Sequence, residues 1–378
     1  MTTLRILLSV LLLLHAAVHL IGAAKWMKLL GRTFALLFFG TFAMLATAAV
    51  LLVLGNASWW TVALPGVLLS QALIIAQWSE AKWGTIANVV VAVPLIVSAA
   101  QARFIERVGA EVSDMMVQEQ RVASGDSRSN VVQASELDRL PPPVRRWLEG
   151  SGVVGHERAR IVWLEQRGEL RTGRDEPWMK VTADQTFTVD DPAFVWTVET
   201  KMGFVPITGR DRYTFGRGEM LVKAAGLVNV ANGRDEKTTQ GAMLRYLGET
   251  VWFPSAALSP YIVWEPIDES NARATMHHAN RTVSASFTFD GAGRVNTVRA
   301  MRWYGSGDEA KLLPWYVPCT DWRDVRGVIV PVRGSVIWEL PEGDFEYYRW
   351  EIVDIETNRR ERSEPPAIAP VAFAEPSP

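Results

Sequence analysis

The sequence predicts an α-helical transmembrane bundle of four spans, followed by an α+β domain whose large curved antiparallel sheet, or incomplete barrel, is wrapped on one or two helices. Three observations predict this fold class. Residues 1–102 contain five Lys and Arg and one acidic residue, for a formal charge of +4, whereas residues 103–378 carry −6. Four long apolar runs occupy those first 102 residues. From about residue 158 to residue 356, apolar and polar side chains alternate with the period of a β-strand.

The uneven distribution of charge excludes several classes of protein. A single soluble domain, a disordered chain or a basic nucleic-acid-binding protein would not combine a nearly uncharged first part with an acidic remainder. An outer-membrane barrel would spread an alternating apolar pattern along the whole chain. The one cysteine, Cys319, excludes an internal disulfide framework and a metal site made only of cysteines.

Each apolar run is long enough to cross a bilayer as a helix. About 20 residues cover the roughly 30 Å hydrocarbon core, and a helix satisfies all its backbone hydrogen bonds within the segment. Tryptophans concentrate in the short connections, where indole rings prefer the headgroup zone. We therefore expect four transmembrane helices, at Ile6–Ala24, Phe34–Leu54, Thr61–Gln77 and Thr85–Ala102.

Basic residues in the connections predict the orientation. Lys25, Lys28 and Arg32 lie in the first connection, and loops rich in Lys and Arg stay in the cytoplasm. The N-terminus and, after four crossings, the C-terminal domain are then outside the cytoplasm. This predicts a multi-pass protein of the bacterial cytoplasmic (inner) membrane with an extracytoplasmic domain. Two alternatives stay open: Arg103 and Arg107 favour the opposite orientation, and cleavage of a signal peptide near residue 24 would leave three spans.

Two histidines share one face of the first span. His15 and His19 are four residues apart, and ionisable groups at bilayer depth are candidates for function. A haem, metal or proton site is one interpretation, but the four spans contain no other histidine and no carboxylate. The other interpretation is hydrogen bonding between helices. From their depth along the helices, we expect His15 to contact Gln71 and His19 to contact Asn88.

Residues 103–136 are expected to form an amphipathic helix and a linker. The apolar side chains of residues 104–116 fall on one stripe, so this helix lies on the bilayer or packs on the domain. Ser124–Asn130 is polar and typical of a linker, and Val144–Glu149 is expected to form a short helix. The β-rich extramembrane domain covers residues 137–357, and a disordered, proline-rich tail covers residues 358–378.

About ten strands are expected in the extramembrane domain, each with one apolar and one polar face. In one of them, Val283, Ala285, Phe287 and Phe289 share a face. Such a sheet must bury its apolar face or curl upon it. The best internal cover is a helix over Thr239–Glu249, so we expect the sheet to curve around this helix.

Few residues of the domain point to catalysis or metal binding. The sequence lacks a phosphate loop, a dinucleotide fingerprint, a metalloprotease helix motif and a Gly-x-Ser-x-Gly motif. His156 is isolated, and His277 and His278 point to opposite faces of a strand, so we interpret all three as surface histidines. Cys319 has no base near it in the sequence and is interpreted as structural. We expect no cofactor, no metal and no catalytic residue.

The densest polar cluster supplies candidate ligand-binding residues. Arg210 and Asp211 lie in a strand, and Arg245 and Glu249 are spaced i, i+4 on the covering helix. This pair either forms a surface ion pair of ~0.3–0.5 kcal/mol or reaches the concave side and orients a ligand headgroup. The many aromatic side chains form either a sheet core or the wall of an apolar site. The candidates are Arg210, Asp211, Arg245, Glu249, Trp252 and Trp264.

Ordered motifs along nearly the whole chain carry a family resemblance. They are His15–Lys25, Ser70–Gln71, Trp78–Thr85 with Ala87–Asn88, Leu140–Leu148, Met243–Glu249 with Trp252–Pro254, and Trp264–Asp268 with Ala272–Ala274. With them the chain resembles a bacterial membrane-protein family of unknown function, in which a short helical bundle precedes a β-rich extramembrane domain. The resemblance implies this architecture and no activity. A curved antiparallel sheet over helices is also loosely similar to the lipoprotein-carrier fold of the bacterial envelope, an analogy of fold that does not determine function.

Three functions are compatible with this organisation. The first is a membrane-anchored extracytoplasmic domain that binds a lipid or other apolar molecule in the concavity of the sheet. Its partners are the lipid bilayer and that molecule, and nucleic acid is not among them. The second is a structural or assembly subunit with a filled interior. The third, less favoured, is a membrane-bound enzyme that uses the Arg, Asp and Glu cluster for acid–base chemistry.

Overall fold

The computed structural model describes residues 3–123, 129–305 and 307–359. The chain divides into two compact units. The first comprises residues 1–107 with 225–228, and the second comprises residues 108–224 with 229–378. The proline-rich tail expected over residues 358–378 lies outside the described residues from residue 360 onward, and so do residues 124–128 of the expected linker.

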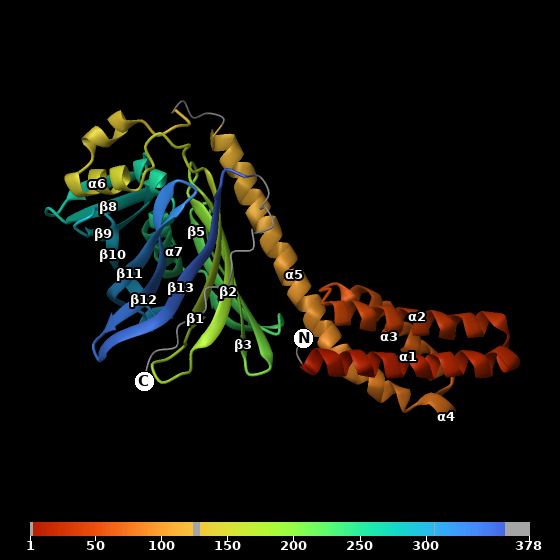
Figure 1. The fold of residues 1–378 in the computed structure, drawn as a ribbon. Helices are drawn as coiled ribbons and strands as arrows, with labels where there is room; N and C mark the ends of the chain where they lie inside the picture. Colours follow the sequence, from red (N-terminus) through yellow and green to blue (C-terminus); the bar gives the residue numbers. More distant parts are fainter. Residues whose placement is uncertain (1–2, 124–128, 306, 360–378) are drawn as a thin grey trace, which may run out of the picture. The chain divides into compact units, whose positions relative to one another are not determined.

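The first unit is helical, as the sequence predicts (Figure 1). Its helices are α1 (Thr3–Leu30), α2 (Arg32–Leu54), α3 (Trp59–Ala76), α4 (Trp78–Ala81) and the beginning of α5 (Gly84–Ala123). Among the described residues, α1, α2, α3 and α5 are long and apolar enough to cross a membrane. The four apolar helices expected from the sequence are therefore confirmed.

Close approach between the first two helices depends on a small residue. A Cβ at Gly22 of α1 would lie 2.7 Å from Cδ1 of Phe38 on α2, which is closer than two such carbon atoms can approach. Glycine at this position lets the aromatic ring pack directly against the backbone of α1. Small residues allow the same close approach between helices that lie in membranes.

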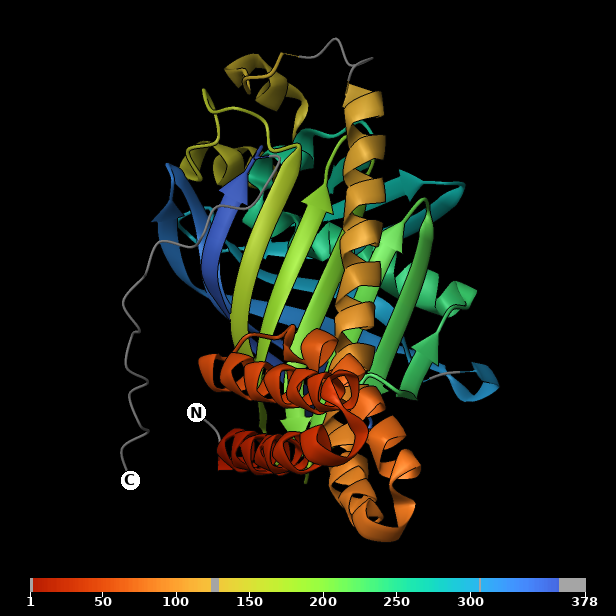
Figure 2. The same ribbon diagram turned by 90° about the vertical axis from the view of Figure 1, so that its right-hand side faces the viewer.

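The second unit is built on one sheet of thirteen described strands (Figure 2). Their order across the sheet is β6-β5-β4-β3-β2-β1-β13-β12-β11-β10-β9-β8-β7, and the pairings are antiparallel, as in β1 with β2 and with β13. The strands are β1 (Ile161–Leu170), β2 (Met179–Thr188), β3 (Ala193–Met202), β4 (Val205–Thr214), β5 (Arg217–Ala224), β6 (Val228–Gly233), β7 (Ile262–Pro266), β8 (Asn271–His278), β9 (Arg281–Phe289), β10 (Val295–Tyr304), β11 (Lys311–Val325), β12 (Val328–Leu340) and β13 (Gly343–Thr357). The sheet curls into a half-barrel, which confirms the predicted fold class.

The sequence underestimates the number of strands, which is thirteen rather than about ten. Strand β4 illustrates the reason, because most of its residues are buried or half-buried on both faces and its sequence lacks a clear apolar–polar alternation. Strands covered on both sides lose the period that identifies a half-buried strand.

Helix α7 (Glu236–Glu249) covers the inside of the curved sheet. It begins three residues before the expected Thr239, because the Asp235 side chain accepts a hydrogen bond from the backbone N–H of Thr238 at 2.7 Å and caps the helix. The helix packs on β4 and β5 on one side and on β9 and β10 on the other. The short helices η2 (Thr250–Trp252) and η3 (Pro254–Leu258) follow it.

Two further helical segments complete the second unit. The predicted short helix is α6 (Pro142–Gly150), which follows η1 (Ala134–Arg139) and packs Trp147 against Phe287 of β9. Helix α5 continues without a break to Ala123, and its last part lies on the convex face of the sheet, where Met115 packs with Ala193 and Val195 of β3 (Figure 2). The sequence predicts that the amphipathic segment either lies on the bilayer or packs on the domain, and in the structure it packs on the domain.

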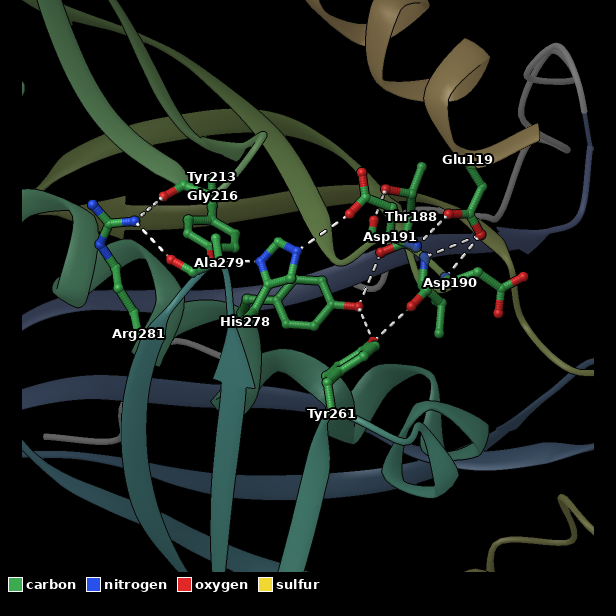
Figure 3. Close-up of polar contacts among 12 residues, drawn as sticks. Glu119, Thr188, Asp190, Asp191, Tyr213, Gly216, Tyr261, His278, Ala279 and Arg281 are labelled. Carbon is green, nitrogen blue, oxygen red and sulfur yellow. Dashed lines mark hydrogen bonds and ion pairs between the residues drawn. The ribbon is translucent and has the colours of Figure 1, made fainter. Parts of the chain in front are cut away.

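One end of the half-barrel is closed by contacts between hairpin tips (Figure 3). The Tyr213 hydroxyl of β4 lies 2.7 Å from Nδ1 of His278 at the end of β8, and Arg281 donates to the carbonyl oxygen of Gly216 at 3.0 Å. Gly216 has a φ of +72°, and a Cβ there would lie 2.3 Å from that of Ala279. The β4–β5 and β8–β9 turns, distant in sequence, therefore meet at this end.

Candidate functional site

A cavity of about 230 Å³ lies on the concave side of the sheet beside α7. Its wall is mainly apolar. The aromatic members are Trp196, Trp252, Trp315, Tyr347, Tyr348 and Trp350, and the aliphatic ones are Leu170, Val198, Met220, Val222, Val251, Val317 and Val336. An apolar concavity with a few polar groups is the usual form of a small-molecule site.

The cavity lies toward the end of the half-barrel opposite the closed one. Leu170 is the last residue of β1 and pairs with Tyr348, near the start of β13. Val222 lies two residues before the end of β5, and Ala224 at that end pairs with Ile207, near the start of β4. These strand ends lie at the same end of the half-barrel, whereas the β4–β5 turn lies at the opposite end.

A buried charge cluster joins α7 to the concave face of the sheet. The Arg245 guanidinium donates from Nε to Glu249 at 2.8 Å, from Nη1 to Asp211 at 2.8 Å and from Nη2 to Gln185 at 3.3 Å. Gln185 in turn donates to the second oxygen of Glu249 at 2.8 Å. The Arg245 guanidinium also lies 4.5 Å from the centre of the Trp196 ring. Arg245 is thus held on all sides by groups of this chain.

The pKa values of both Arg245 and Glu249 are raised in this buried cluster. Burial raises the pKa of Glu249, and the neighbouring Arg245 only partly offsets the effect. Burial also opposes the charge on Arg245, but the carboxylates of Glu249 and Asp211 outweigh it and raise the pKa of the guanidinium. Both carboxylates are engaged as acceptors for one guanidinium, an arrangement that holds a helix to a sheet.

Arg210 is also among the residues that line the cavity, but its side chain points away from the other candidate residues. Successive side chains of a strand point to opposite faces, so Asp211 faces α7 and Arg210 faces outward. The Arg210 guanidinium lies 3.3 Å from Glu111 of α5 and 3.1 Å from Glu219 of β5, and its side chain is 4% exposed. Arg210 therefore ties α5 to the convex face.

The two candidate tryptophans lie in different places. Trp252 lines the cavity, where its ring meets that of Trp350 edge-on with the ring centres 5.1 Å apart. Its buried indole N–H has no hydrogen-bond partner among the described residues. Trp264 is not among the residues that line the cavity; its N–H donates to the carbonyl oxygen of Ala257 at 3.0 Å, and its ring packs against Phe287.

Arg302 is a cavity residue that the sequence reasoning missed. It lies on β10 two residues before the strand ends, and its guanidinium lies over the rings of Trp315 and Trp338. The signal was available, because Val298, Ala300 and Arg302 share one face of the predicted strand. An arginine on an otherwise apolar face is unusual enough to be singled out.

In the helical unit, the expected polar residues meet in a different pairing. His15 Nε2 donates to Asn88 Oδ1 at 2.8 Å, and His19 Nε2 lies 2.9 Å from the hydroxyl of Ser70, which also donates to Asn88 at 3.0 Å. Asn88 donates to Gln71 at 3.0 Å. The expected contacts of His15 with Gln71 and of His19 with Asn88 are thus replaced by a network centred on Ser70 and Asn88, because depth along a helix does not determine which face meets its neighbour.

The remaining residues with reactive side chains have structural surroundings. Cys319 is fully buried, and burial raises the pKa of its thiol to about 12, which agrees with a structural role. His156 and His277 are exposed, as expected. His278 differs from the surface interpretation, because it is half-buried between Tyr213 and the Asp191 carboxylate, 3.2 Å away. No group of three or more His, Cys, Asp or Glu able to hold a metal ion occurs within the described parts of the chain.

Fold and cavity together define a class of protein: a half-barrel sheet folded over a helix, in a chain that also carries four apolar helices of membrane-spanning length. Residues 130–350 match the family described as "Family of unknown function (DUF6544)", and the chain belongs to this family. No curated protein matches the sequence.

Three solved structures are similar to this chain at low identity. A putative outer membrane lipoprotein-sorting protein domain from Vibrio parahaemolyticus is 8% identical, with a TM-score of 0.32, over 54% of this chain and 87% of that one. A LolA superfamily protein from Nitrosomonas europaea is 10% identical, with a TM-score of 0.32, over 61% and 96% of the two chains. A DUF1329 family protein from Desulfovibrio piger is 8% identical, with a TM-score of 0.29, over 61% and 95%. The first of these, a lipoprotein-sorting domain, agrees with the loose similarity of fold to envelope lipoprotein carriers.

Proposed function

We propose that the domain binds a lipid or other apolar molecule in the cavity of its curved sheet, while the four apolar helices anchor it in the bacterial inner membrane. The observation that carries this proposal is the cavity of about 230 Å³ with its mainly aromatic and aliphatic wall. A structural subunit with a filled interior would have no reason to leave this space between α7 and the sheet, because protein interiors are close-packed.

The size of the cavity limits what it can hold. An engineered apolar cavity of about 150 Å³ accepts one benzene molecule, so about 230 Å³ suits a single short acyl segment or a small ring system. Burying six methylene groups there would contribute roughly 5 kcal/mol before the cost of association. We therefore expect moderate affinity for one chain, with the remainder of a larger lipid outside the cavity.

The orientation proposed for the domain is extracytoplasmic. Lys25, Lys28 and Arg32 follow the first apolar run in the sequence, which favours a cytoplasmic first connection. Four crossings then return the chain to the outer side, where lipids and lipid-linked molecules of the envelope are accessible.

A photo-crosslinking experiment with the full chain in phosphatidylcholine nanodiscs tests the binding proposal. The probe is a fatty acid with a diazirine near the end of its chain, and labelled peptides are identified by mass spectrometry. Val222→Trp fills the cavity, and Leu221→Trp is its matched control, because Leu221 is half-buried on the opposite face of the same strand.

We expect the wild type and Leu221→Trp to be labelled on cavity peptides, and labelling of Val222→Trp to fall about tenfold, as for the loss of roughly 1.4 kcal/mol of binding free energy. Equal labelling of the two tryptophan variants would contradict the proposal. Absence of cavity labelling in the wild type would favour an assembly subunit instead.

A further inference from the structure

Among the described residues, three arginines line the cavity. The Arg210 guanidinium is engaged on the convex side by Glu111 and Glu219. The other two, Arg245 and Arg302, are in contrasting situations. Each of the three guanidinium nitrogens of Arg245 already donates to a group of this chain, namely Glu249, Asp211 and Gln185. Arg302 is half-buried at the cavity wall and, within the described residues, makes no ion pair and no hydrogen bond. Its guanidinium nitrogens have no partner in the described parts of the chain and are not fully buried. They are therefore accessible to a molecule in the cavity.

Aromatic rings position the Arg302 guanidinium without using its N–H donors. The guanidinium carbon lies 5.2 Å from the centre of the Trp315 ring and 5.9 Å from that of Trp338. In a cation–π contact the cation lies over the face of the ring, and the ring supplies no acceptor oxygen for the N–H groups. The N–H groups at the edge of the guanidinium remain available for a planar anion such as a carboxylate or for a phosphate, which arginine binds with two parallel hydrogen bonds.

A glycine of α7 makes room for this arginine. A Cβ at Gly241 would lie 3.0 Å from Nε and 3.4 Å from Nη2 of Arg302, so the guanidinium would have to shift by a few tenths of an ångström to accommodate alanine. Glycine inside a helix is unfavourable compared with alanine, and its presence here fits a need for space. Helix α7 therefore makes space for the Arg302 side chain, which β10 carries and which the rings of Trp315 and Trp338 contact.

The charges around the cavity are compatible with an anion beside Arg302. Asp211 and Glu249 line the same cavity, but both are bound to Arg245. The lining also includes Arg210, which is paired with Glu111 and Glu219. Arg302 is therefore the one lining arginine that has no acidic partner among the described residues.

We propose that the ligand is an anionic amphiphile, with its acidic headgroup bound to Arg302 and its apolar chain in the aromatic part of the cavity. This inference rests on the proposed function and names the chemical class of its ligand. The headgroup chemistry is a carboxylate or a phosphate, as in a free fatty acid or a single-chain phospholipid.

The test compares three photoreactive probes that share one diazirine-bearing chain: a fatty acid, the corresponding long-chain alcohol and a lysophosphatidic acid. The full chain is held in phosphatidylcholine nanodiscs, whose lipid carries no net charge. The variants are Arg302→Met, which removes the donors, Gly241→Ala, which displaces them, and Arg299→Met as the control. Arg299 lies on the other face of β10, where it is paired with Glu339.

We expect wild-type cavity peptides to be labelled about tenfold more by an acidic probe than by the alcohol, as for one charge-assisted hydrogen-bonded pair. The acid with the higher labelling identifies the source, carboxylate or phosphate. Arg302→Met should lower acid labelling to the level of the alcohol, whereas Gly241→Ala, which shifts the guanidinium only slightly, should lower it in part. Labelling by the alcohol should be retained in both variants, which also reports a folded domain. Arg299→Met should behave as the wild type.

Two results would overturn the inference in different ways. Equal labelling by acid and alcohol in the wild type, or a preference for acid retained in Arg302→Met, would refute the headgroup assignment while leaving apolar binding intact. Absence of cavity labelling by all three probes would refute the proposed function itself.

Discussion

Two arginine–glutamate pairs with the same i, i+4 spacing differ in their surroundings. Arg145 and Glu149 on α6 are each 48% exposed, whereas Arg245 and Glu249 on α7 are 13% and 14% exposed. In both pairs the Nε–Oε1 distance is 2.8 Å. The sequence alone shows two similar pairs, and burial makes one of them structurally important, because a buried charge left without its partner is strongly unfavourable.

Replacing the buried arginine should therefore destabilise the domain strongly. In Arg245→Met, the carboxylates of Asp211 and Glu249 lose their partner, and we expect the free energy of unfolding to fall by about 3–5 kcal/mol. The matched control is Arg145→Met, for which we expect no measurable change in the unfolding midpoint. Urea unfolding of the full chain in nanodiscs, followed by tryptophan fluorescence, measures both, and equal midpoints for the two variants would show that burial does not distinguish the pairs.

At the scale of elements, helix α5 is attached to the domain at both ends of its docked part. Glu111 lies 3.3 Å from Arg210 and 3.2 Å from Arg212. About two turns later, Glu119 accepts hydrogen bonds from the backbone N–H groups of Asp190 at 2.9 Å and Asp191 at 2.8 Å, in the β2–β3 turn (Figure 3). Between these contacts lies the apolar stripe of α5, so charge and apolar packing together hold this helix on the sheet.

Glu119 makes this attachment dependent on pH. It lies beyond the apolar run that ends at Ala102, and burial raises its pKa to about 7, with the nearby Asp190 adding to the effect and the turn N–H groups of Asp190 and Asp191 opposing it. The folded state therefore keeps the proton to a higher pH than the unfolded state does. It follows that the contribution of Glu119 to stability is greatest below about pH 4.5 and falls as the pH rises to about 7.

We expect Glu119 to contribute a loss of roughly 3 kcal/mol in the free energy of unfolding between those two pH values. Glu119→Gln should remove this slope, because the amide stays neutral and still offers an acceptor oxygen. Asp114→Asn, at an exposed position of the same helix, should keep the slope. Urea unfolding between pH 4.5 and 8 gives the slopes, and an unchanged slope in Glu119→Gln would exclude this carboxyl as its source.

At the scale of the whole molecule, the side of the membrane on which the domain lies determines which molecules can enter the cavity. The native thiol cannot report it directly, because Cys319 is fully buried and the pKa of its thiol is raised to about 12. An exposed position is needed, and Glu342 in the β12–β13 turn provides one.

We expect Glu342→Cys to react with a membrane-impermeant maleimide in intact spheroplasts. Met27→Cys, at the exposed end of α1 beside the basic connection, is the control and should react only after lysis. The wild type should react only when denatured, which sets the background from Cys319. The reverse pattern, with Glu342→Cys labelled only after lysis, would place the domain in the cytoplasm and exclude an envelope ligand.

The sequence by itself determined the four apolar helices, the large antiparallel sheet and the helix that covers it. These features depend on local composition and on periods of 2 and 3.6 residues, which neighbouring residues carry. The same reasoning singled out Asp211, Arg245, Glu249 and Trp252, which line the cavity, because charged and aromatic residues cluster beside the expected covering helix.

Only the tertiary structure decided which face each of these residues serves and which groups remain unpaired. Arg210 pairs with Glu111 of α5 on the convex face, His15 contacts Asn88 rather than Gln71, and Arg302 keeps its donors free of partners among the described residues. Each of these outcomes depends on segments far apart in the sequence being brought together. Local periodicity contains no information about such contacts, because they arise from the packing of whole elements against one another.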